Sequence, residues 1–132
     1  MGDNWSTRNA QAEVKDCIDA CAELVQASED CADACLLLGG NGDATACFLA
    51  DLDCVEVGTT TIRVLGWHSR SDGVTTEAVL QACRQAASES ILACERMTRA
   101  NPSWTSCVAV GRRTVAACTT LLAAPSTPSE AS

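Results

Sequence analysis

Cysteine residues are the side chains of this sequence most able to do chemistry: there are ten in 132 residues. Most fall in pairs that are four or eleven residues apart, which is about one or three turns of an α-helix. Such spacing aligns thiols along one helix face, and thiols on facing helices form a site for soft metal ions. The pairs are Cys17/Cys21, Cys31/Cys35, Cys83/Cys94 and Cys107/Cys118, and the other two cysteines are Cys47 and Cys54.

Helices are the elements that must position these thiols. No proline or glycine interrupts residues 10–38, and the four cysteines of that segment fall within one narrow stripe. The glycine-rich cluster at residues 39–42 stops this helix, and Pro102 with a neighbouring capping residue opens the last one. We expect helices over about residues 10–38, 43–67, 74–99 and 103–123.

The second of these helices has the weakest signal, because its later part, VEVGTTTIRVLG, is rich in β-branched residues and could form a strand by propensity alone. Four helices with short connections predict an all-α fold, an antiparallel up-down-up-down four-helix bundle with a cysteine-lined core. We expect residues 1–124 to form this single domain. The Pro/Ser-rich residues 125–132 are expected to be a disordered tail.

The depth of each thiol in the bundle follows from counting residues away from the turns at Asn41 and Asn101, which share one end. Each helix then delivers a thiol to one level about 10 Å below that end, at roughly 1.5 Å per residue. A second level lies deeper, with Cys54 between the two. We assign Cys31, Cys35, Cys47, Cys94 and Cys107 to the upper ligands, and Cys17, Cys21, Cys54, Cys83 and Cys118 to the lower ones.

Composition excludes several classes of function. A net charge of −8 without a local Lys/Arg cluster gives no electrostatic basis for binding nucleic acid. No apolar stretch is long enough to cross a membrane, and no export signal is evident, so we expect a cytoplasmic protein whose cysteines stay reduced. His68 is the only histidine, and we expect no Cys/His or Ser/His/Asp arrangement around it, so we do not expect an enzyme.

Several segments resemble the bacterial cysteine-rich four-helix-bundle copper storage proteins. They are CIDAC at 17–21, DCADAC at 30–35, ACFLADLDC at 46–54, ACERM around Cys94 and the last cysteine pair, and the likeness runs from Val14 to Leu122. The resemblance implies a bundle core filled with thiolates that hold many Cu(I) ions. It also implies a cysteine-depleted member, because other residues stand where the family pattern leads one to look for cysteine: Leu24, Ser28, Asp51, Ala87, Ser90, Gly111 and Thr114.

Taken together, these features predict Cu(I) binding for storage or buffering, with several ions per chain held by all ten cysteines. Cu(I) is soft and prefers two or three thiolates, which can bridge neighbouring ions. Copper ions are the expected partner. The sequence leaves open whether a copper donor protein delivers them and whether the chain forms a homo-oligomer. The alternatives are an iron–sulfur bundle, a zinc site of four thiolates, and a structural or interaction bundle whose buried cysteines only pack.

Overall fold

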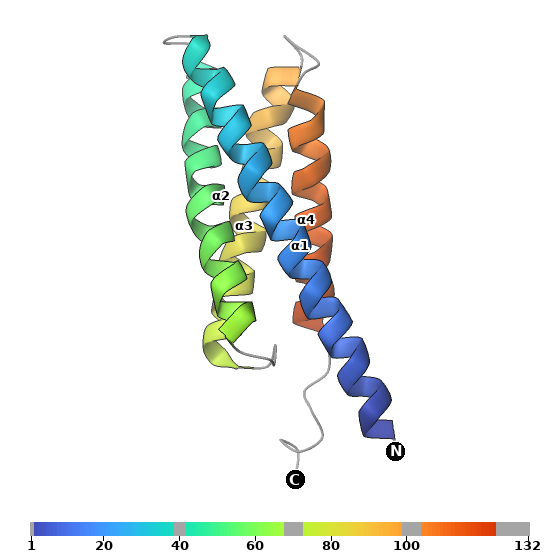
Figure 1. The fold of residues 1–132 in the computed structure, drawn as a ribbon. Helices are drawn as coiled ribbons and strands as arrows, with labels where there is room; N and C mark the ends of the chain where they lie inside the picture. Colours follow the sequence, from blue (N-terminus) through green and yellow to red (C-terminus); the bar gives the residue numbers. More distant parts are fainter. Residues whose placement is uncertain (1, 39–41, 68–72, 99–103, 124–132) are drawn as a thin grey trace.

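The computed structural model describes residues 2–38, 42–67, 73–98 and 104–123, without the side chains of residues 2–9. The described chain forms a bundle of four helices, each lying beside its neighbour in sequence, with the first also beside the last (Figure 1). The predicted antiparallel four-helix bundle is therefore confirmed. Its helices are α1 (Gly2–Leu37), α2 (Gly42–Trp67), α3 (Val74–Thr98) and α4 (Thr105–Ala123).

Helix α1 is longer than the sequence pattern indicated. It begins at Gly2 instead of near residue 10, and its N-terminal part projects beyond the other helices (Figure 1). The apolar and cysteine stripe marks only the part of a helix that packs against neighbours, whereas the preceding residues continue the helix because no proline or glycine stops it. At the other end, the Leu38 N–H donates to the Cys35 carbonyl at 3.1 Å.

Helix α2 is helical throughout, including its β-branched part, so a strand does not form there. The Thr61 hydroxyl donates to the Val57 carbonyl at 2.7 Å, and Thr61, Val64 and Leu65 are buried. Tertiary packing therefore overrides the weak local preference for a strand. Gly58 lets α1 approach closely, since a Cβ atom there would lie 2.9 Å from Val25 Cγ2.

Packing divides the core into two clusters along the bundle axis, and each contains half of the predicted ligands. One cluster surrounds Leu24, Leu65, Leu80 and Leu121, and the other surrounds Met97 and Trp104. The first holds Cys17, Cys21, Cys54, Cys83 and Cys118; the second holds Cys31, Cys35, Cys47 and Cys94, with Cys107 packed against it. Turn residues Asn41, His68 and Asn101 lie outside the described residues, as does the predicted tail at 125–132.

Gly111 marks the close approach of α4 to α3, because a Cβ atom there would lie 2.8 Å from Ile91 Cγ1. We expect Gly111→Ala to lower the free energy of unfolding by about 1 kcal/mol, since overpacking outweighs the gain in helix propensity. Urea denaturation of the reduced, metal-free protein measures the change.

Gly66→Ala is the matched control, because nothing lies within 4 Å of its added Cβ atom and the residue is exposed. It should stabilise the protein by about 0.5 kcal/mol through helix propensity alone. Equal effects of the two substitutions would contradict the close helix contact at Gly111.

Candidate metal centre

The upper thiol cluster consists of Cys31, Cys35, Cys47, Cys94 and Cys107, and all four helices contribute to it. The sulfur atoms of Cys31 and Cys47 are 3.6 Å apart, those of Cys47 and Cys94 are 3.6 Å apart, and those of Cys31 and Cys94 are 3.9 Å apart. These three sulfurs form a triangle small enough for one soft ion to contact them all.

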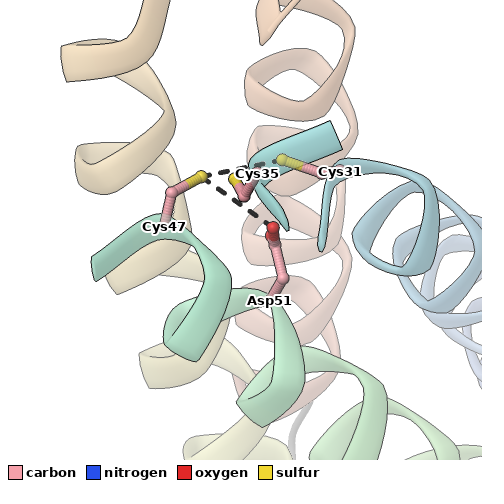
Figure 2. A group of neighbouring side chains, drawn as sticks. All are labelled: Cys31, Cys35, Cys47 and Asp51. Carbon is pink, nitrogen blue, oxygen red and sulfur yellow. Dashed lines mark hydrogen bonds between the residues drawn. The ribbon is translucent and has the colours of Figure 1, made fainter. Parts of the chain in front are cut away.

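The remaining two thiols extend this triangle in different directions. Cys107 lies with Cys31 and Cys94 in a group whose sulfurs are all within 4.8 Å of one another. Cys35 belongs to a second group, of four donors within the same 4.8 Å limit, with Cys31, Cys47 and the carboxylate of Asp51 (Figure 2). Only Cys107 is partly exposed, so it is the thiol of this cluster nearest to solvent.

Asp51 is a buried carboxylate, with 1% of its surface exposed. Its Oδ2 accepts the Cys47 thiol at 3.8 Å, whereas Oδ1 has no hydrogen-bond partner among the described residues. Burial raises the pKa of Asp51 from 3.8 to about 7. The sequence marked Asp51 as an inward acid that needs a partner, and the structure supplies Cys47 for one oxygen only.

Trp104 is the second buried group with an unused polar atom. Its side chain is 5% exposed, and the indole Nε1 has no hydrogen-bond partner in the described part of the chain. Burial raises the pKa of Cys35, and the proximity of the Cys47 thiol and the Trp104 indole opposes part of that rise. The Trp104 N–H is thus placed to stabilise a thiolate at Cys35.

The lower thiol cluster consists of Cys17, Cys21, Cys83 and Cys118, from α1, α3 and α4. The sulfurs of Cys17 and Cys118 are 3.8 Å apart, and those of Cys21 and Cys83 are 3.7 Å apart. Helix α2 places the buried Thr61 at this level instead of a thiol, and the Thr61 hydroxyl interacts with Cys83. The lower cluster is therefore smaller than the upper one.

Cys54 is buried but belongs to neither group of neighbouring donor atoms. Its thiol donates to the Ala86 carbonyl at 3.4 Å, and the hydroxyls of Ser90 and Ser28 lie near it. Burial raises the pKa of Cys54 to about 12. The sequence assigned Cys54 to the lower ligands. Cys54 does pack in the lower half of the core, but its sulfur belongs to none of the groups of neighbouring donor atoms.

The positions where the family pattern leads one to look for cysteine all face the interior. One of them, Thr114, is fully buried, and its hydroxyl donates to the Ala20 and Val110 carbonyls. At these positions the core carries apolar groups, hydroxyls and one carboxylate instead of sulfur, so fewer thiols line it than the family pattern would give. The buried residues at these positions are Leu24, Ser28, Asp51, Ala87, Ser90, Gly111 and Thr114.

Hydrogen bonds between neighbouring thiols couple the ionisation of the sulfurs within each cluster. Hydrogen bonds from Cys118 and Cys21 lower the pKa of Cys17 in the lower cluster. Hydrogen bonds from its cluster neighbours likewise lower the pKa of Cys94 in the upper cluster, while burial raises the pKa of Cys35. Because the thiolate is the form that binds metal, these thiol–thiol hydrogen bonds favour the form of each cluster that takes a first ion.

A four-helix bundle with thiol clusters in its core belongs to the class of bundles built to hold soft metal ions. Residues 10–123 match the family described as copper storage protein. The chain belongs to this family, and the resemblance that the cysteine segments indicated is confirmed.

Solved structures of a copper storage protein from Streptomyces lividans are similar to this chain. One, a cytosolic copper storage protein loaded with five coppers, is 34% identical over 89% of this chain and 98% of that chain, with a TM-score of 0.80. Another, loaded with 10 copper equivalents, is 34% identical over 86% of each chain, with a TM-score of 0.77. Both similarities cover nearly the whole bundle.

A third similar structure is a variant of the Streptomyces lividans protein in which two histidines are replaced by alanine. It is 36% identical over 89% of this chain and 97% of that chain, with a TM-score of 0.78. The present chain has a single histidine, His68, so it cannot supply two. A comparison with curated protein sequences gave no match. Among the described residues, no helix is long and apolar enough to cross a membrane.

Asp51→Asn should change how the stability of the metal-free protein depends on pH. Because the pKa of Asp51 is raised in the folded state, folding favours the neutral acid. The resulting destabilisation is absent below about pH 4 and grows as the pH rises through about 7, to roughly 4 kcal/mol at most. Asp51→Asn removes it, so the variant should be more stable than the natural chain at pH 8.

Urea denaturation of the reduced protein at several pH values between 4 and 8 measures this difference, which should shrink toward the acidic end. Asp53→Asn is the control, since Asp53 lies on the same helix with an exposed side chain. A stability difference between Asp51→Asn and the natural chain that does not vary with pH would contradict the buried, ionisable state of Asp51.

Proposed function

We propose that this protein stores Cu(I) in the core of its bundle, with thiolates of the upper and lower clusters as ligands. The observation that carries the proposal is the convergence of nine buried or half-buried sulfurs into two groups, with the nearest sulfurs 3.6 to 3.9 Å apart. Membership of the copper storage protein family and the copper-loaded Streptomyces lividans structures support it.

The chemistry of the clusters fits a soft, monovalent ion. Thiolates that bind two or three to an ion can bridge neighbouring ions, so a compact group of sulfurs holds several ions together. Binding replaces thiol protons, and the metal thereby ionises sulfurs whose pKa burial has raised, such as Cys54. Loading should therefore release protons and weaken at low pH.

Two separate clusters imply that each loads as its own unit. The other inward side chains, such as those of Ser28, Ser90 and Thr114, offer hydroxyl and methyl groups, which are poor ligands for Cu(I). Cys54 is the tenth candidate ligand, and its thiol would have to give up the hydrogen bond to the Ala86 carbonyl in order to bind. The five and ten coppers of the Streptomyces lividans structures support a capacity of several ions.

The proposed storage role involves no catalytic turnover. It also places the protein in the cytoplasm, and the similarity to a cytosolic copper storage protein supports this location. The proposal also includes a copper donor that delivers the ion. Self-association is part of the proposal because Leu36, Leu49 and Leu52 expose 62%, 55% and 43% of their surfaces on adjacent helices.

Serine substitutions test the two clusters separately. We expect the fourfold serine variant of the lower cluster to lose the Cu(I) held there and to keep the rest, because the upper sulfurs do not depend on it. The fivefold serine variant of the upper cluster should show the converse. Anaerobic titration of reduced protein with Cu(I), against a chromophoric competitor, counts the ions that each variant retains.

Cys54→Ser is the matched control and should change capacity least, because its sulfur lies outside both donor groups. Circular dichroism verifies that each variant keeps its helices. If the natural chain failed to outcompete a modest chelator, the storage function would be wrong. Brown visible absorption with iron in the isolated protein would support the iron–sulfur alternative instead.

A further inference from the structure

We infer that Cys31, Cys35, Cys47 and Asp51 also form a four-coordinate site for a divalent cation of borderline softness, with Zn(II) as the best match. The four donor atoms come from α1 and α2 and converge on one point within the upper cluster (Figure 2). This inference goes beyond Cu(I) storage and does not rest on it, because it concerns a different ion and a different donor set.

The spacing of the donors suits tetrahedral coordination. With Zn–S bonds of about 2.3 Å and a Zn–O bond of about 2.0 Å, neighbouring ligands of a tetrahedron lie about 3.8 Å apart for two sulfurs and about 3.5 Å apart for sulfur and oxygen. The sulfurs of Cys31 and Cys47 are 3.6 Å apart, and Cys47 Sγ lies 3.8 Å from Asp51 Oδ2. Cys35 completes the set, with all four atoms within 4.8 Å of one another.

Asp51 is the residue that points to a divalent ion. A carboxylate oxygen is a hard ligand that Cu(I) does not prefer, whereas Zn(II) accepts Asp oxygen together with Cys sulfur. Asp51 is 1% exposed, and its Oδ1 lacks a hydrogen-bond partner among the described residues. A buried, half-satisfied acid is costly unless it is paired with a charge or a metal, and a cation at this point would satisfy it.

Trp104 supplies the second unsatisfied group at the same place. Three thiolates and one carboxylate around a divalent ion leave excess negative charge, which requires hydrogen-bond donors outside the ligands. The buried Trp104 N–H forms no hydrogen bond among the described residues, and its proximity opposes part of the rise in the pKa of Cys35. One unused acceptor and one unused donor therefore flank a single set of three thiols.

Zn(II) and Cu(I) would compete for this part of the core, since Cys31 and Cys47 belong to both donor sets. The triangle of Cys31, Cys47 and Cys94 offers sulfur only, which favours the softer ion. Zn(II) would therefore occupy the site while Cu(I) is scarce and leave as Cu(I) arrives. The lower cluster contains no carboxylate among its grouped donors and would not take part.

Titration of the reduced protein with Co(II), a spectroscopic substitute for Zn(II), tests the site. We expect one Co(II) per chain, with tetrahedral d–d bands in the visible and sulfur-to-cobalt charge transfer in the near ultraviolet, and bleaching of both by Zn(II). Asp51→Asn should weaken Co(II) binding at least tenfold and shift the d–d bands, because the anionic oxygen ligand is lost. Cys47→Ser should abolish binding.

Cys118→Ser is the matched control from the lower cluster and should bind Co(II) as the natural chain does. The inference is overturned if the natural chain binds no Co(II) or Zn(II), if Asp51→Asn binds with unchanged affinity and spectrum, or if Cys118→Ser alone removes binding. Cu(I) titration of the same preparations keeps the two functions apart, since Cu(I) uptake without Co(II) uptake would overturn only the divalent site. Circular dichroism excludes unfolding as the cause of a loss.

Discussion

The close approach of buried thiols from separate helices is the constraint on which the rest of the structure depends. Sulfurs such as Cys31, Cys47 and Cys94 lie within 4 Å of one another while remaining free thiols. A thiol is a weak hydrogen-bond donor and a small apolar group, so it packs in a dry core without strong partners. The helices can therefore pack tightly around a core whose thiols remain available to bind metal.

Small residues make this closeness compatible with a stable bundle. Gly58 and Gly111 bring α2 against α1 and α4 against α3, and aromatic side chains are almost absent from the interior. Larger residues at these contacts would push the helices apart and separate the sulfurs. The packing that stabilises the fold is thus the same packing that sets the distances between metal ligands.

The two clusters differ in chemistry as well as in position. The lower one groups only sulfurs, whereas Asp51 and Trp104 add an acceptor and a donor to the upper one, both without full hydrogen bonding among the described residues. Burial keeps the pKa of Asp51 near 7, so its charge is poorly tolerated without a positive partner. Within the described ranges, the buried polar side-chain atoms that lack a hydrogen bond therefore lie in the upper half of the core.

Sequence alone determined the bundle, the helical stripe of cysteines and their division into two depths, because helical periodicity places residues four or eleven apart on one face. Only the tertiary structure decided that the Cys54 thiol donates to the Ala86 carbonyl and that an oxygen of Asp51 accepts the Cys47 thiol. It also decided that α2 stays helical past Gly58 and that α1 starts at Gly2. These outcomes depend on how neighbouring helices rotate and pack, which the spacing along one chain does not specify.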